Sequence, residues 1–144
     1  MVEQYLPGEL NSSDIKFFLL EIHHYYPYLF DLAYVDEWSE KLSKFAYCAC
    51  IKKDNLIQSA CLYYCNQQTK IAYITLIAVS PDAVHGSGYE LFSVCHHDAQ
   101  KNGMEKLQLE VLKSNSHAYC FYLRQGFSCV AVHDDKLMME MSIV

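Results

Sequence analysis

The first third of the chain carries apolar residues at helical spacing. Residues 11–25 start with Ser12 and Ser13, either of which can cap a helix, and Pro27 ends the segment. The apolar positions within it lie three and four residues apart, at Ile15, Phe18, Leu19 and Ile22. Residues 32–44 repeat this spacing with Leu32, Val35, Trp38 and Leu42. The pattern therefore predicts two helices, each with one face toward a core.

Short and dense apolar runs follow, and polar turns separate them. The runs cover residues 45–51, 56–65 and 71–79, and the third is β-branched and almost uncharged. The turns at 52–55 and 66–69 are short enough to join neighbouring antiparallel strands. We therefore predict a three-stranded antiparallel meander.

After Val79 the chain alternates between helical and strand patterns. Gly103 and Gly126 lie where helices commonly end. We predict a helix from residue 86 or 87 to 102, a strand at 106–111, a helix at 115–125, and strands at 127–133 and 136–142. Together the elements predict a single α/β domain over residues 1–144, with a mixed, mostly antiparallel sheet of about six to seven strands and about four helices.

Composition narrows the classes of partner. The formal net charge is −6, and the basic residues are scattered, so we expect no nucleic-acid partner. No apolar run approaches the roughly 20 residues of a membrane span, and the N-terminus does not resemble a signal peptide. We therefore expect no membrane partner and a cytoplasmic location. Hydrophobic residues make up 52% of the chain, a surplus that leaves two alternatives open, a homodimer interface or an apolar cleft.

The cysteines and histidines do not show the spacing of a metal site. Cys48 and Cys50 would share one face of a strand, but no matching second pair follows them. His23-His24 and His96-His97 are adjacent pairs, whose side chains diverge on a helix. We expect no metal, and we interpret the seven cysteines as small buried hydrophobic residues.

The first chemical signal is the glycine-containing segment after Val79. A buried strand runs into Gly86-Ser87-Gly88, which opens a helix, and unpaired N–H groups at a helix N-terminus suit a phosphate or pyrophosphate. The nucleoside-triphosphate loop requires Lys followed by Ser or Thr, whereas Tyr89-Glu90 follow here. The dinucleotide fingerprint is also incomplete. Alternatively, the two glycines only permit a tight turn between strand and helix.

The second signal lies on the helix predicted over residues 115–125. Asn115 stands at the strand-to-helix junction, and Ala118 and Tyr122 share one helix face because they are four residues apart. A phenol, whose usual pKa is about 10, can protonate a departing thiolate. The same spacing also fits a core helix in which Tyr122 is merely buried.

From the meander onward, over residues 56–144, the chain resembles the GNAT acetyltransferase superfamily. The strand–Pro–Gly-x-Gly–helix segment is similar to the acetyl-CoA pyrophosphate motif of that family. The series of Asn115, Ala118, Tyr122 and Gly126-Phe127 is similar to its second cofactor motif, which is the more specific match. The final strand, residues 136–144, also resembles the last strand of the family.

The resemblance implies acetyl-CoA as cofactor, inserted where the strands ending at Val79 and Val111 separate. It implies that backbone groups near Ile77 and Val79 form hydrogen bonds with the pantetheine amides. It also implies that Asn115 bonds or positions the pantetheine arm beside Ala118. Tyr122 would be the general acid. The loop residues whose backbone would hold the pyrophosphate are Val84, His85, Gly86, Ser87, Gly88 and Tyr89.

The loop departs from the family pattern in one important respect. Ala83 stands where the family usually has Gln or Arg, Val84 stands where a further Gly is common, and the stretch after Pro81 is one residue short. The missing side chain removes one phosphate contact, which protonated His85 would replace in part. Because backbone donors remain, we expect weaker cofactor binding rather than none.

The resemblance implies direct transfer of an acetyl group to a primary amine of a small molecule or a protein. The alternative is a non-catalytic GNAT-fold domain that binds acyl-CoA as a sensor or interaction module. Glu110 is our candidate base because it lies on a cleft strand, but Tyr73, Glu21 and His23 are alternatives that spacing does not exclude. The acceptor is not apparent. The aromatic run at residues 25–30 either lines an acceptor cleft or packs between the first two helices.

Overall fold

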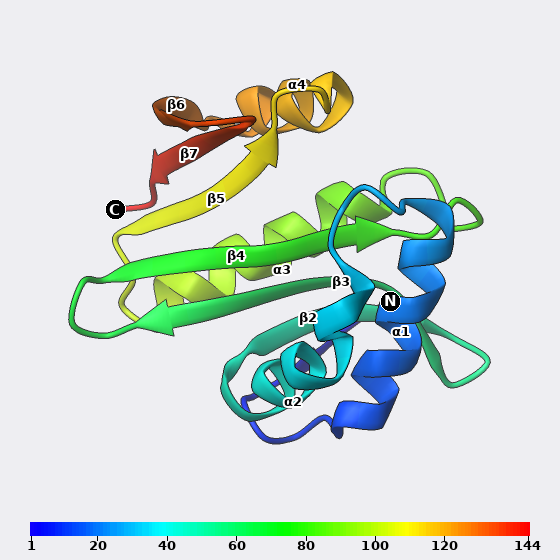
Figure 1. Ribbon diagram of the computed structural model, residues 1–144. Coiled ribbons are helices and arrows are strands. Elements are labelled where there is room, and N and C mark those ends of the chain that lie inside the picture. The colour runs from blue at the N-terminus through cyan, green and yellow to red at the C-terminus, as the bar shows by residue number, and fades with distance from the viewer.

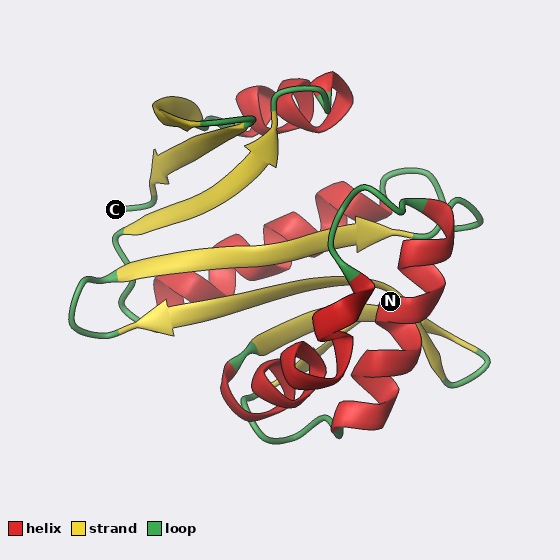
Figure 2. Ribbon diagram, viewed as in Figure 1, coloured by secondary structure: helices red, strands yellow, loops and turns green.

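The computed structural model describes residues 1–144 as one twisted sheet with helices on both faces (Figures 1 and 2). The elements are, in order, β1 (Val2–Tyr5), α1 (Ser12–Tyr25), the 3₁₀ helix η1 (Leu32–Tyr34), α2 (Val35–Phe45), β2 (Tyr47–Lys53), β3 (Leu56–Asn66), β4 (Ile71–Val79), α3 (Ser87–Lys101), β5 (Lys106–Leu112), α4 (Ser116–Gln125), β6 (Ser128–His133) and β7 (Lys136–Ser142). The predicted fold class is confirmed.

The sheet has seven strands in the order β1-β2-β3-β4-β5-β7-β6. Only β4 and β5 pair in parallel, and all other neighbours are antiparallel. The sequence analysis missed β1, so its order of elements was wrong at the start. This strand is short and lies at the sheet edge, and it alternates too briefly to be recognised without its partner β2.

Two hydrophobic cores lie on opposite faces of the sheet. Ile15, Phe18, Leu19 and Ile22 of α1 and Leu42 of α2 are buried in one core, as their spacing predicts. The other core receives buried residues of α3 and Tyr122 of α4. Figure 1 shows α1 and α2 in front of the central strands and α3 behind them. No helix combines the length and the apolar character required to cross a membrane.

A β-bulge at Thr75 changes which face the side chains of β4 occupy. In the β3–β4 ladder, Leu62 pairs with Leu76 and the next residue, Tyr63, pairs with Ile74, so Thr75 is the extra residue. Before the bulge, Ile74 packs in the α3 core. After it, Leu76 packs in the core of α1 and α2.

The bulge also marks the point where β4 and β5 part. Their pairing ends at Ile74 and Leu109, although β4 continues to Val79 and β5 to Leu112. Figure 1 shows β5 turning away from β4 toward α4. The predicted separation of the two strands is confirmed, and it leaves the backbone of residues 75–79 without a strand partner on the β5 side.

Candidate active site

Two cavities open where the strands part, and they meet at Tyr122. The loop cavity, about 650 Å³, lies against the segment between β4 and α3. The strand cavity, about 780 Å³, lies between the separated ends of β4 and β5. Both are lined by the same six residues, Tyr28, Leu29, Ile77, Asn115, Ala118 and Tyr122. A ligand group placed at Tyr122 is therefore accessible from both the loop cavity and the strand cavity.

The loop cavity gathers every residue that the sequence assigned to cofactor binding. These residues come from β4, from the loop and first turn of α3, and from α4, and they are Ile77, Val79, Val84, His85, Gly86, Ser87, Gly88, Tyr89, Asn115, Ala118 and Tyr122. Segments far apart in the sequence thus form one surface.

Unpaired backbone donors line the entrance to α3. The N–H groups of Val84, His85, Gly86, Gly88 and Tyr89 donate to no acceptor within the protein. Ser87 differs, because its N–H and its hydroxyl both donate to the Val84 carbonyl oxygen. With the partial positive charge of the helix N-terminus, these free donors form a place where an anion is stabilised.

Gly86 sets the direction of these donors. It precedes α3 with φ of 92°, in the left-handed region that residues with a side chain adopt only at a cost. Gly88 has no such requirement, because a Cβ added there would meet Val79 Cγ2 at an ordinary 3.5 Å. The two glycines therefore have different roles.

Asn115, at the strand-to-helix junction, is the N-cap of α4. Its Oδ1 accepts a hydrogen bond of 3.2 Å from the backbone N–H of Ala118. Its side-chain amide nitrogen has no partner in the protein, so this group is free to donate into the cavities. Ala118 and Tyr122 then line both cavities from one face of α4, as their spacing predicted.

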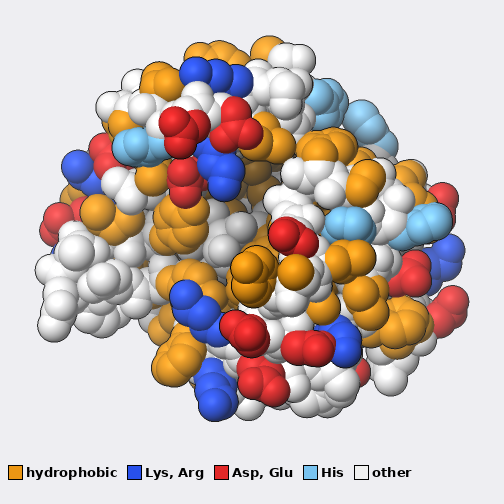
Figure 3. All heavy atoms as spheres, viewed as in Figure 1, with side chains coloured by type: hydrophobic (Ala, Val, Ile, Leu, Met, Phe, Trp, Pro, Cys, Tyr) orange, Lys and Arg blue, Asp and Glu red, His pale blue; other side chains and the backbone are white.

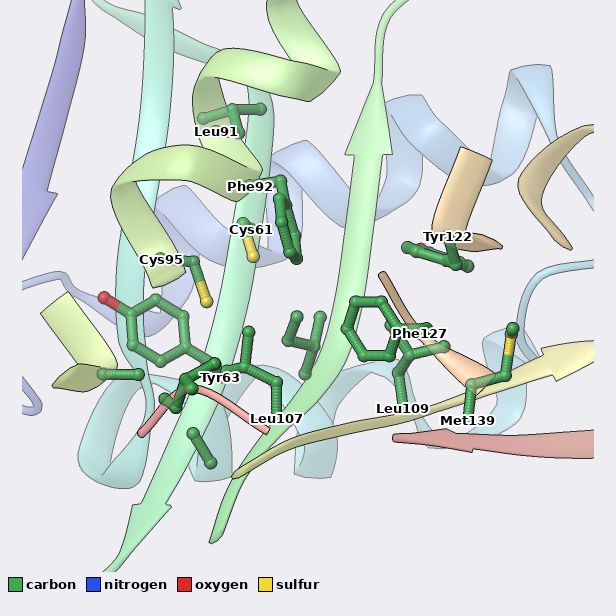
Figure 4. Close-up of a cluster of buried hydrophobic side chains, with 14 of the residues drawn as sticks. Cys61, Tyr63, Leu91, Phe92, Cys95, Leu107, Leu109, Tyr122, Phe127 and Met139 are labelled. Carbon is green, nitrogen blue, oxygen red and sulfur yellow. The ribbon is translucent and has the colours of Figure 1, made fainter. Parts of the chain in front are cut away.

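The Tyr122 ring is held firmly while its hydroxyl stays accessible. The residue is only 7% exposed, and its ring contacts Phe121 edge to face. It contacts Phe127 in the same way (Figure 4). The hydroxyl makes no hydrogen bond, and it is not a sealed polar atom, since Tyr64 is the only residue with a buried, unpartnered side-chain oxygen. Burial raises the pKa of Tyr122 well above its usual value, so the phenol is protonated at neutral pH.

The strand cavity contains three of the four candidate bases. Glu110, Tyr73 and His23 line it, whereas Glu21 does not. The Tyr73 hydroxyl donates a hydrogen bond of 3.2 Å to Glu110 Oε1, across the point where β4 and β5 separate. Burial and the negative charge of Glu110 raise the pKa of Tyr73 to about 12. Tyr73 is therefore a donor, and Glu110 is the proton acceptor of the pair.

The aromatic run between α1 and η1 lines the two cavities and also packs beside the helices. Tyr26 and Tyr28 line the loop cavity, and Tyr28 and Phe30 line the strand cavity. Phe30 also contacts Trp38 of α2 edge to face. The Tyr26 hydroxyl donates to the Val79 carbonyl oxygen at 3.0 Å, which ties this segment to the end of β4.

The sequence analysis did not assign Arg124, the only arginine of the chain. It lines the loop cavity with His85 and His117, forms no salt bridge, and no Asp or Glu lines this cavity. Residues two apart on a helix do not share a face, so the spacing from Tyr122 gave no signal for Arg124. Arg124 supplies a positive charge that Ala83 in the loop does not.

Comparison with known proteins agrees with this geometry. The chain resembles PaiA N-acetyltransferase from Thermoplasma acidophilum, whose structure is a complex with coenzyme A, with 18% identity, 99% of both chains covered and a TM-score of 0.76. It also resembles the ribosomal-protein-S18-alanine N-acetyltransferase from Escherichia coli, with 18% identity, 99% of this chain and 94% of that chain covered, and a TM-score of 0.77. No curated protein matches the sequence significantly.

At these identities the two structures establish the fold alone. The sequence profile of the Acetyltransferase (GNAT) family, however, matches residues 15–127, which is most of the chain. This family consists of acetyl-CoA-dependent N-acetyltransferases. The protein therefore belongs to the GNAT acetyltransferase family.

Proposed function

We propose that this protein transfers an acetyl group from acetyl-CoA to a primary amine, with Tyr122 as general acid and Glu110 as general base. The observation that carries the proposal is the position of Tyr122. Its unpartnered, accessible hydroxyl lies at the junction of one cavity suited to an anion and another that holds a carboxylate. An acyl donor that carries phosphates requires the first kind of cavity, and an amine acceptor requires the second.

The residues of the loop cavity fit coenzyme A. The free N–H groups between Val84 and Tyr89 would hold the pyrophosphate, with Arg124 adding positive charge nearby. The β4 backbone from Thr75 to Val79, unpaired on the β5 side, would bond the pantetheine amides. The Val79 carbonyl oxygen already accepts from Tyr26, but a carbonyl oxygen has two lone pairs and can accept a second bond.

When bound, acetyl-CoA supplies the acetyl group as a thioester, so that a C–N bond forms at the acceptor amine as the C–S bond breaks. Glu110 takes the proton that the amine nitrogen loses, and Tyr122 gives the proton that the sulfur gains. Tyr73 orients the Glu110 carboxylate through the 3.2 Å hydrogen bond. The burial that keeps Tyr122 protonated also disfavours an unprotonated thiolate beside it, which supports proton donation at this place.

The proposal is tested by two measurements on the purified protein. The first is thermal melting with and without coenzyme A, because a ligand that binds only the folded state raises the midpoint. The second is release of free thiol from acetyl-CoA in the presence of a panel of primary amines. We expect both a raised midpoint and amine-dependent release. If coenzyme A raises the melting midpoint but no amine causes release of free thiol, the result would instead support the non-catalytic acyl-CoA-binding alternative.

A further inference from the structure

The two cavities differ sharply in the charge of their linings. The loop cavity has Arg124 and two histidines but no carboxylate. The strand cavity has three carboxylates, Asp31, Glu110 and Asp135, against one lysine, Lys136, and one histidine, His23. The space-filling view shows acidic side chains on both sides of the recess between the β5–β7 part and the α1 part (Figure 3). The acceptor side is therefore a negatively charged compartment.

The negative charge of the strand cavity is not neutralised within the protein. Asp31 lies in the loop before η1, Glu110 on β5 and Asp135 in the turn between β6 and β7, so the carboxylates come from three separate segments. None of them forms a salt bridge, and all three residues are exposed. Asp31 accepts a hydrogen bond from the backbone N–H of Ala33, and Glu110 accepts one from the Tyr73 hydroxyl. Neither bond removes the charge.

The walls of the strand cavity also suit a cation. Tyr28, Phe30 and Tyr73 line it with aromatic rings, whose faces attract a positive charge. The Tyr122 hydroxyl, which is unpartnered and belongs to a residue more than nine-tenths buried, lies where this cavity meets the loop cavity. The reacting amine is expected beside Tyr122 and Glu110. Asp31 and Asp135 are then free to bind another part of the acceptor.

We infer that the acceptor is at least a dication, an amine whose second ammonium group is recognised by Asp31 and Asp135 at the rim of the strand cavity. This inference rests on the proposed function and specifies its substrate class. One carboxylate is sufficient as the base, and the two others have no role in the chemistry. An acceptor with a distant carboxylate, such as an amino acid, would be repelled by the same groups.

The test compares acceptors of equal chain length that differ only in the charge of the far end. The probes are diaminobutane, diaminopentane and diaminohexane, the n-alkyl monoamines of the same carbon counts, and the matching ω-amino acids. We expect kcat/KM for the best diamine to exceed that of its monoamine by about tenfold or more, and the ω-amino acid to be the poorest. Equal values for diamine and monoamine would overturn the inference.

Charge-neutralising variants assign the effect to particular residues. Asp31→Asn and Asp135→Asn should each lower the diamine-to-monoamine ratio by about threefold, and Lys136→Gln should raise it. Asn is as good a helix cap as Asp, so Asp31→Asn preserves the local fold. Asp134→Asn is the matched control, since it removes the same charge from the same turn at a residue that does not line the cavity. An equal loss in Asp134→Asn and Asp135→Asn would contradict a local site.

Binding separates this inference from the proposed function. Thermal melting of the coenzyme A-loaded protein should show a rise with diamine that the equivalent monoamine does not produce. This rise without any acetylation would support the dication site and contradict the proposed catalysis. Acetylation of monoamines and diamines at equal rates, with equal melting shifts, would support the catalysis and contradict the dication site.

Discussion

The Tyr26 hydroxyl donates a hydrogen bond of 3.0 Å to the backbone carbonyl oxygen of Val79, although the two residues are 53 positions apart. Val79 is the last residue of β4, beyond the point where β5 has separated. The bond therefore joins the aromatic segment after α1 to the strand end that forms one wall of the loop cavity.

Tyr26→Phe should lower the free energy of unfolding by about 1 kcal/mol, because the ring remains and only this half-buried hydrogen bond is lost. Urea denaturation measures the change. Tyr28→Phe is the matched control, since the Tyr28 hydroxyl makes no hydrogen bond and the side chain is exposed. Equal effects of the two substitutions would show that the Tyr26 bond does not stabilise the fold.

Arg124→Gln should weaken coenzyme A binding by about threefold to tenfold, because it removes the only arginine from a cavity without carboxylates. Ala83→Arg, which restores the side chain type expected in the loop, should strengthen binding by a similar factor. Isothermal titration measures both. Lys53→Gln removes the same charge from the exposed end of β2, outside the loop cavity, and should leave the affinity unchanged. An unaltered affinity in Arg124→Gln would remove Arg124 from the binding site.

Gly86→Ala should lower the free energy of unfolding by about 1–2 kcal/mol. The added methyl group meets nothing within 4 Å, so the cost comes from the left-handed backbone alone. Gly88→Ala should leave stability unchanged or raise it, because Ala is the better helix former and the contact with Val79 is ordinary. Chemical denaturation of both variants checks this contrast, and the reverse order would contradict the described loop conformation.

Tyr73 should make the free energy of unfolding depend on pH in the alkaline range. Burial and Glu110 raise the pKa of Tyr73 to about 12, from an ordinary 10.0, so the unfolded chain loses this proton at a lower pH than the folded protein does. The stabilisation is therefore complete below about pH 10 and is lost as the pH rises toward 12.

Tyr73→Phe should flatten the fall in unfolding free energy over this range by up to about 1.4 kcal/mol per pH unit. Denaturation curves at several pH values measure the slope. Tyr34→Phe is the control, since Tyr34 is 64% exposed and makes no side-chain hydrogen bond. A slope unchanged in Tyr73→Phe would contradict the burial of this phenol against Glu110.

The loop-cavity residues of the α3 entrance and of α4 could be predicted from the sequence because their signals are local. The four-residue step from Ala118 to Tyr122 fixes one helix face, and Gly86 fixes the turn into α3, so both depend on nearby residues only. The helices and the six longer strands follow from hydrophobic periodicity for the same reason. These features can be predicted without knowing which residues pack against them.

The remaining features arise from contacts between distant segments. The bulge at Thr75 is visible only in the pairing of β3 with β4, and β1 is recognisable only beside β2. Asp31 and Asp135 lie in two loops that no spacing relates, yet both line the strand cavity. The carboxylates at the rim of the strand cavity were therefore beyond sequence reasoning, whereas the residues of the α3 entrance and of one α4 face were not.

The kcat of Tyr122→Phe, measured at saturating amine and acetyl-CoA, tests the proposed chemistry most directly. The substitution keeps the ring that packs on Phe127 and removes only the hydroxyl, so we expect kcat to fall by at least about tenfold while KM for acetyl-CoA changes by less than about twofold. Tyr119→Phe, at a tyrosine of α4 outside both cavities, should retain the original kcat. An unchanged kcat in Tyr122→Phe would contradict the assignment of this phenol as the proton donor.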